Sequence, residues 1–545
     1  MRKNKTYLSI SKISNNLFSI AGRAGHWIQS VWQKSWTSAV LFVLILLIGV
    51  FARLWQYREL PPGLNQDEAS IGVEAYDLLH YGMDRNGISD PVFFISWGSG
   101  QNALYAYLLI PFIYLFGISP FIVRLPMLIS GILSMPLMYW IGDRLLGRNC
   151  GLLAMFLLAI APWHILLSRW GLESNILPFV FLIGFACLLK SIEIRIWFIP
   201  ACIAFALCLY AYGTAYAAVP LFLSAAVILL VLGKHFDFRF IFFGLLFAAV
   251  ISLPIGAFVV INSSKLGSIH IGPMTIPRLP VEARFINVAA TSSSNFIEAI
   301  ARNTWSMLKL LLFTQSDGML WNVADPFGYL YVFSFPLALI GAVLLFTVRN
   351  ARNATGNLLL LAWLIASLSI GVIQSANINR LNLVFLPIIL CTAVCMYWLG
   401  QNSKIVLVTL IGIFLFSFIA FNVTYHGSNY KANANVDFYA GLIPALDHAR
   451  QAGNQPICVT DRVNMPYIFV LFSEKPNPAA FLGTIDYIDP SASFRQVRSM
   501  ERYYFGLVNC PADPSMIYVL ADEKLPDNGI QYTDTIFTQF HVYSP

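Results

Sequence analysis

Charged residues are scarce in this chain of 545 residues. Only 11% of its residues are Asp, Glu, Lys or Arg, whereas 58% are hydrophobic. Soluble domains carry roughly 25% charged residues. A chain this apolar cannot hide its surface from water, so a soluble protein is excluded and a bilayer must cover that surface.

Other absences exclude further classes of protein. The apolar runs hold almost no acidic or basic residue near their centres, although pumps and secondary transporters usually carry such residues there. No internal repeat is obvious, so an inverted-repeat transporter has no positive support. The 8 cysteines lack metal-ligand spacing. Two of them, Cys458 and Cys510, fall in the C-terminal tail and could form a disulfide there.

What the sequence does contain is a series of apolar runs of about 20 residues, the length of a helix that crosses the hydrocarbon core of a bilayer. Such runs must be helical, because lipid offers the backbone no hydrogen-bond partner. We predict about eleven spans on this basis, at 37–55, 120–142, 151–167, 174–190, 195–212, 215–232, 239–262, 328–348, 357–373, 380–399 and 404–421.

Lys and Arg residues predict the orientation, since cytoplasmic loops hold the excess of both. The segment 1–36 is basic, so we place it in the cytoplasm and interpret the first run as a signal anchor without a cleavage site. The basic loops alternate correctly only if the apolar segment 101–117 stays on the outer side as a juxtamembrane or re-entrant helix. These loops contain Arg144 and Arg148, Lys190 and Arg195, Lys234 and Arg239, Arg349 and Arg352, and Lys404.

The predicted fold is therefore a multi-pass all-α membrane domain, residues 37–421, followed by an extracytoplasmic α/β domain, residues 422–545. The membrane domain carries two large outer loops, 56–119 and 263–327. In the tail, short apolar runs predict strands and two amphipathic stretches predict helices. The strands are expected at 456–460, 516–523 and 535–543, and the helices at 439–451 and 465–474. This domain could bind an acceptor or cap the membrane domain.

An acidic motif follows the first span, in the segment LPPGLNQDEASIGVEAYDLLHYG at 60–82. Two prolines and a glycine break the helix, and Asp67 and Glu68 then open a new one. Carboxylates in a first helical turn are favoured by the unpaired backbone N–H groups there. A carboxyl group at the membrane boundary can also serve as a general base, because desolvation raises its pKa.

This motif, with the segments LYAYLLIPFIYLFG and FIVRLPMLISGILSMPLMYWIGDRLLGR that follow it, resembles the C-type (polytopic membrane) glycosyltransferases. It is most similar to bacterial relatives of the protein O-mannosyltransferases and of the aminoarabinose transferase that modifies lipid A. The resemblance covers roughly residues 37–420. It implies an enzyme of the plasma membrane whose active site faces outward and which moves a hexose or pentose from a polyprenyl-phosphate carrier to an acceptor hydroxyl.

The resemblance also implies partners and catalytic residues. The expected partners are the bilayer, the lipid-linked sugar donor and a glycan, lipid or protein acceptor, without nucleic acid. The essential acidic position of the family maps onto Asp67, with Glu68 as its neighbour. A second acidic position, in the pattern Ser-Arg-x-x-x-Asp/Glu, maps onto Ser168, Arg169 and Glu173. Relatives commonly have Asp at this last position. The HPP or KPP motif of many relatives is absent, and the region reads GSGQNALYAY.

The transfer reaction needs a base near the acceptor hydroxyl and cations near the leaving phosphate. Asp67 is the predicted base, with Glu68 and Glu173 as further catalytic candidates. Arg380 is the leading phosphate ligand, although an Arg at a helix end can also snorkel to the headgroups. The other substrate-binding candidates are Arg169, Arg124, Asp317, Asn322 and Asp325. Arg124 could instead anchor the acidic loop.

A divalent cation, Mg²⁺ or Mn²⁺, is possible but not required. The carboxylates of Asp67, Glu68 and Glu173 would suit these ions as oxygen ligands, and no spacing demands one. Two other functions compete with the glycosyltransferase. One is a transporter or flippase of lipid-linked sugars, which predicts a polar path through the membrane. The other is a non-catalytic envelope assembly factor, which would tolerate loss of the acidic motif.

Overall fold

The computed structural model describes residues 36–545 apart from 236, 283–294, 348–352 and 528. The basic segment before the first span lies outside the described residues, as do Arg349 and Arg352. The cytoplasmic location of the N-terminus therefore stays a prediction.

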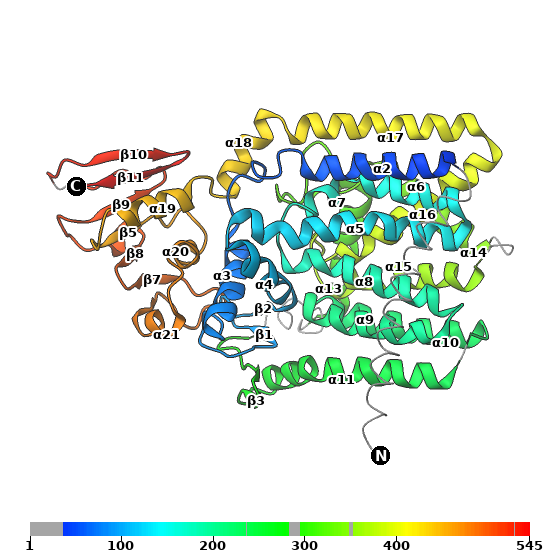
Figure 1. Ribbon diagram of the computed structural model, residues 1–545, viewed down its shortest axis with the longest axis horizontal. Coiled ribbons are helices and arrows are strands. Elements are labelled where there is room, and N and C mark those ends of the chain that lie inside the picture. The colour runs from blue at the N-terminus through cyan, green and yellow to red at the C-terminus, as the bar shows by residue number, and fades with distance from the viewer. Residues whose placement is uncertain (1–35, 236, 283–294, 348–352, 528) are drawn as a thin grey trace, which may run out of the picture.

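Among the described residues, eight helices are long and apolar enough to cross a membrane. They run roughly side by side in one bundle (Figure 1). Each coincides with a predicted span, and together they make this an integral membrane protein. The helices are α2 (Trp36–Leu54), α5 (Pro120–Leu146), α8 (Glu173–Ser191), α10 (Ala215–Leu232), α11 (Phe238–Ser263), α15 (Ala354–Ile373), α16 (Asn382–Asn402) and α17 (Lys404–Tyr425).

The remaining predicted spans coincide with shorter apolar helices, α6 (Arg148–Ile160), α9 (Phe198–Ala211) and α14 (Ser334–Thr347). A count of eleven spans is therefore not confirmed. The predicted span 151–167 is not one helix, because α6 ends at Ile160 and α7 (Pro162–Leu167) begins after a break. Pro162 explains the break, since proline lacks the N–H that a helix interior needs. The next residue, Trp163, donates its backbone N–H to the Tyr329 carbonyl at 2.9 Å.

The apolar segment that we predicted not to cross forms α4 (Leu104–Phe116). Its 13 residues span only about 20 Å at the helical rise of about 1.5 Å per residue, less than the roughly 30 Å of a hydrocarbon core. The helix packs against α5 and against α3 (Gln66–Tyr81). This length fits the prediction that the segment does not cross the membrane. The placement of α4 on the outer side stays a prediction.

The two ends of the bundle differ in chemistry. At one end, ion pairs join the basic loops, with Arg144 and Lys190 both bound to Glu193 and Arg195 paired with Asp237 at 3.4 Å. The other end carries α3, α4 and the C-terminal domain (Figure 1). The bundle thus has one basic face and one face where the large loops gather.

The large loops meet through short backbone pairings. The first loop contains strands β1 (Phe93–Phe94) and β2 (Gln101–Asn102), and the second contains β3 (Ile269–Ile271), β4 (Met274–Ile276) and α13 (Phe296–Lys309). Val92 donates its N–H to the Thr275 carbonyl at 3.0 Å, which joins the two loops. Gly98 of the first loop pairs with Phe494 of the tail. All three predicted outer pieces therefore converge, as the prediction that they share one side of the membrane requires.

The tail begins with α18 (Ser428–Asp437) and folds into a domain around a mixed seven-stranded sheet with the order β10-β11-β9-β5-β8-β7-β6. The central strand β5 runs parallel to β8 and β9, and the other neighbours are antiparallel. The strands are β5 (Ile457–Val459), β6 (Asp486–Tyr487), β7 (Val497–Met500), β8 (Tyr503–Phe505), β9 (Ile517–Leu520), β10 (Thr533–Phe537) and β11 (Phe540–Ser544), with helices α19 (Leu442–Gln451), α20 (Pro466–Glu474) and α21 (Pro478–Phe481).

Two features of this domain refine the sequence analysis. The predicted single strand 535–543 is wrong, because the run folds back at Thr538 and Gln539 into the hairpin of β10 and β11. Cys458 of β5 and Cys510 form a disulfide, with their Cα atoms 5.7 Å apart. The pairing that the sequence left open is thus present in the structure.

Candidate active site

Helix α3 begins at the acidic motif because the local sequence caps it. Asn65 is the N-cap residue, and its side chain accepts a hydrogen bond from the Asp67 backbone N–H at 2.9 Å. Glu68 completes a capping box by accepting the Asn65 N–H at 3.2 Å. The helix ends at Gly82, whose φ of 67° lies in the left-handed region that favours glycine. The capping interpretation of the motif is therefore correct for Glu68.

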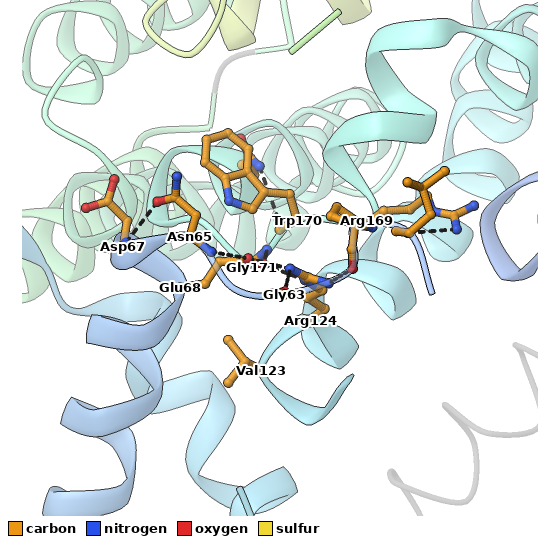
Figure 2. Close-up of polar contacts among 12 residues, drawn as sticks. Gly63, Asn65, Asp67, Glu68, Val123, Arg124, Arg169, Trp170 and Gly171 are labelled. Atoms are coloured by element: carbon orange, nitrogen blue, oxygen red, sulfur yellow. Dashed lines mark hydrogen bonds and ion pairs between the residues drawn. The ribbon is translucent and has the colours of Figure 1, made fainter. Parts of the chain in front are cut away.

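Glu68 is fully buried and forms an ion pair with Arg124 of α5. Its two carboxylate oxygens lie 2.7 and 2.6 Å from Arg124 Nε and Nη2. Glu68 also accepts the backbone N–H of Gly171 at 2.8 Å, and Arg124 donates to the Pro61 and Gly63 carbonyls. Figure 2 shows Gly63, Glu68, Arg124 and Gly171 close together around this ion pair. This geometry favours the anchoring alternative for Arg124 over substrate binding, and it gives Glu68 a structural role.

Asp67 lies apart from the ion pair of Glu68 and Arg124. In Figure 2 its carboxylate points away from Arg124 and Gly171. The side chain is half-buried, and its Oδ1 accepts a hydrogen bond from the indole Nε1 of Trp97 at 3.2 Å. The two adjacent carboxylates of the motif therefore face different surroundings, and of the two only Asp67 faces away from the buried ion pair.

Arg169 is also fully buried, and its guanidinium donates to backbone carbonyls rather than reaching the surface. The partners are the Leu60 carbonyl at 2.9 Å and the Ala52 carbonyl at 3.3 Å. The same guanidinium lies 5.3 Å from the ring centre of Tyr425. These contacts hold the end of α2 and the start of the first loop. They support a clamping role, and nothing in the geometry supports the substrate-binding role predicted for this residue.

Glu173 and Arg380 line the same pocket, which has a volume of about 60 Å³. Glu173 begins α8 and accepts the backbone N–H of Asn102 from β2. Arg380 precedes α16, and its Nη1 donates to the carbonyl and the hydroxyl of Ser375. The structure thus brings together two candidates that lie far apart in the sequence, one carboxylate and one guanidinium.

A polar network holds the segment that carries Arg380. Asp317 accepts hydrogen bonds from the Asn322 side chain at 2.8 Å and from the Ile378 N–H at 3.0 Å. Asn322 also donates to Asn379 at 2.7 Å, and Asn379 donates to Ser174 of α8 at 3.2 Å. Asp317 and Asn322 therefore support the pocket wall through backbone and amide groups.

Asp325, the remaining candidate of the second outer loop, lies in an exposed turn. Its neighbours Ala324 and Phe327 form the isolated bridge that closes this turn. The structure does not bring Asp325 into the pocket with Glu173 and Arg380.

The segment where the sequence departs from its relatives forms part of the pocket. Ser99, Gly100 and Asn102, all within GSGQNALYAY, line it together with Phe93 and Thr214. Sequence reasoning gave no site role to any of these residues. The departure from the HPP or KPP pattern of many relatives was the available signal, because it lies in this segment.

A group of buried carboxylates lies further along α3 and just beyond its end, where sequence analysis gave no residue a role. Glu74, Asp77 and Asp84 are each at most 2% exposed. The buried Arg85 forms an ion pair with Glu74 at 3.4 Å. Burial and the nearby charge of Glu74 raise the pKa of Asp77 to about 9. Burial and the same charge raise the pKa of Asp84 to about 8. Burial thus favours the protonated form of both side chains.

No group of three or more His, Cys, Asp or Glu side chains in the described part of the chain is arranged to hold a metal ion. Glu68, one of the predicted oxygen ligands, is occupied by Arg124. Asp67 and Glu173 keep the hard oxygen atoms that Mg²⁺ or Mn²⁺ prefers.

Comparison with known proteins finds likeness in structure but not in sequence. No protein-family model and no curated protein match the chain. The crystal structure of ArnT from Cupriavidus metallidurans bound to undecaprenyl phosphate aligns with a TM-score of 0.55 at 13% identity, over 93% of this chain and 97% of that one. The apo form of the same protein gives a TM-score of 0.52 at 14% identity over the same shares.

The apo oligosaccharyltransferase of Archaeoglobus fulgidus aligns with a TM-score of 0.48 at 14% identity, over 82% of this chain and 64% of that one. ArnT, the aminoarabinose transferase of lipid A, is a C-type glycosyltransferase. Its likeness to this chain at such low identity shows the fold. The chain therefore has the fold of the C-type glycosyltransferases, as the acidic motif and the following segments predicted.

Proposed function

We propose that this protein is a membrane glycosyltransferase that moves a sugar from a polyprenyl-phosphate donor to an acceptor hydroxyl on the extracytoplasmic side. The observation that carries the proposal is the pocket lined by Glu173 and Arg380, beside the loop that contacts Asp67. The fold adds support, because the similar ArnT structure holds undecaprenyl phosphate.

The chemistry assigns a role to each group. The acceptor oxygen attacks the anomeric carbon and forms the new glycosidic bond, while the bond from that carbon to the phosphate oxygen breaks. Asp67 takes the proton of the acceptor hydroxyl. The phosphate leaves with the bonding electron pair, and Arg380 stabilises the negative charge that develops on it. The second carboxylate, Glu173, lies on the pocket wall and is the alternative base.

The extracytoplasmic side is supported by two features. The C-terminal domain contains the disulfide of Cys458 and Cys510, and disulfides persist mainly in oxidising compartments outside the cytosol. Helix α3, which contains Asp67, strand β2, which contributes Asn102 to the pocket, and this domain lie at one end of the bundle (Figure 1). The basic loops lie at the opposite end, and an excess of Lys and Arg is typical of cytoplasmic loops. We propose the plasma membrane as the location, and the likeness to the ArnT structure supports it.

The test is transfer by the purified protein in detergent, with undecaprenyl-phosphate-linked hexose or pentose as the donor probe and an envelope extract from cells lacking the protein as the acceptor source. A glycosyltransferase releases undecaprenyl phosphate and labels an acceptor. A transporter or flippase gives neither product, because a micelle has no second compartment. Mass spectrometry of envelope glycans with and without the protein then names the sugar and the acceptor. Glycans unchanged by loss of the protein, together with no release of undecaprenyl phosphate, contradict the proposal.

A further inference from the structure

Trp97 links the C-terminal domain to the proposed base, Asp67. Its indole N–H donates to Asp67 at 3.2 Å, and its side chain is 4% exposed. An indole N–H can only donate, so it orients the carboxylate without competing for the proton of an acceptor.

Several contacts hold the Trp97 indole in place. The Arg85 guanidinium lies 4.5 Å from the centre of the ring, in the range of a cation–π contact. Arg85 is itself held by Glu74 at 3.4 Å and by the Ser70 hydroxyl at 2.7 Å. Because Arg85 is paired and buried, it cannot easily move away. The indole is therefore pressed against a rigid neighbour in the first outer loop.

The remaining contacts come from the C-terminal domain. Tyr467 of α20 meets the indole edge-on, with ring centres 6.1 Å apart. The Arg495 backbone N–H donates to the Trp97 carbonyl at 3.0 Å, and Phe494 pairs with Gly98 next to it. Two separate segments of the domain thus contact Trp97 of the first loop. The following residues of that loop, Ser99 and Gly100, line the pocket.

We propose that Trp97 is a positioning residue that aims the Asp67 carboxylate, and that the C-terminal domain is a working part of the active site because it holds Trp97 in place. This inference rests on the proposed function, since it assumes that Asp67 is the base. The ordinary alternative is a buried tryptophan whose N–H has simply found an acceptor. The two differ in what loss of the N–H does to turnover.

The test compares Trp97→Phe with Trp363→Phe in the full-length protein. Both replace a buried indole by a smaller ring, but Trp363 Nε1 has no hydrogen-bond partner among the described residues. We expect Trp97→Phe to lower kcat about tenfold, equivalent to about 1.4 kcal/mol, with the KM for the undecaprenyl-phosphate-linked donor unchanged. Trp363→Phe should leave both constants as they are. An unchanged kcat in folded Trp97→Phe protein overturns the inference.

Combination with Asp67→Asn separates positioning from general damage. If Trp97 acts through Asp67, then Trp97→Phe has no further effect on the residual activity of Asp67→Asn protein. A further tenfold loss in that background shows an independent structural effect and overturns the inference. If Trp97→Phe does not fold, Tyr467→Leu replaces it as the variant. It should lower kcat about threefold, by a loss of about 0.65 kcal/mol, with KM constant, and an unchanged kcat overturns the role of the domain.

The outcomes also separate this inference from the proposed function. An active Asp67→Asn variant refutes the assignment of the base, whatever Trp97 does. An inactive Asp67→Asn variant with a fully active Trp97→Phe variant refutes only the positioning role.

Discussion

Substitution of the two adjacent carboxylates of the acidic motif, Asp67 and Glu68, should lower the stability of the fold to very different degrees. Glu68 is fully buried and binds Arg124 through both oxygens, and it also accepts the N–H of Gly171. In Glu68→Gln protein the buried guanidinium loses its counter-charge, and breaking a buried pair in this way costs about 3–5 kcal/mol. Asp67→Asn keeps an oxygen that can accept the Trp97 N–H, and it removes a favourable carboxylate in the first turn of a helix, worth about 0.3–1 kcal/mol.

Thermal unfolding of the detergent-purified variants, followed by loss of the monodisperse peak on size-exclusion chromatography, measures this difference. We expect a midpoint several degrees lower for Glu68→Gln and little change for Asp67→Asn. The double variant Glu68→Gln/Arg124→Met is the control, because removing both charges should recover part of the stability. A Glu68→Gln midpoint equal to that of the wild type, or a larger fall for Asp67→Asn, would refute the assignment of Glu68 to structure and Asp67 to chemistry.

Three further predictions concern the pocket, the buried carboxylates and the topology. Arg380→Ala should weaken binding of undecaprenyl phosphate by about 1.5–3 kcal/mol, the worth of a charged hydrogen bond, at an unchanged unfolding midpoint; unchanged binding would return the residue to the snorkelling class. Burial raises the pKa of Asp77 to about 9, so the fold loses stability as pH rises from about 4 towards 9. Asp77→Asn should therefore reduce the fall of the unfolding midpoint between pH 6 and 9. Parallel midpoint-against-pH curves for the wild type and the variant would contradict this. A cysteine placed at Leu146 should be labelled only from the cytoplasmic side, and labelling from outside would contradict the predicted topology.

The membrane domain was largely predictable because a bilayer imposes both the length and the apolarity of each span. The break before Pro162 had a visible signal, yet the apolar run hid it. The hairpin at Thr538 had no visible signal in the sequence. This β-branched residue adopts a φ of 56°, whereas turns usually place Gly or Asn at such a position. Local pattern therefore fixed most of the helices and missed one reversal of the chain.

The candidate site was only partly predictable, because its pairings join distant segments. The sequence placed Glu68 and Arg124 in two separate motifs, and only the fold shows that they neutralise each other. Arg169 looked like a free cation at an outer turn, whereas the structure surrounds it with carbonyls. The meeting of Glu173 with Arg380 in one pocket likewise depends on how α8 and α16 pack.

The central claim is that Asp67 is the base of a sugar transfer, and turnover of Asp67→Asn protein tests it most directly. Purified, folded variants are compared with a defined undecaprenyl-phosphate-linked sugar at saturating donor. The account predicts a loss of about 10²–10⁴-fold in Asp67→Asn protein, the usual contribution of base catalysis, because an amide cannot take the proton of the acceptor. Near-normal turnover of Asp67→Asn protein beside an inactive Glu173→Gln variant would contradict it and transfer the role of base to Glu173.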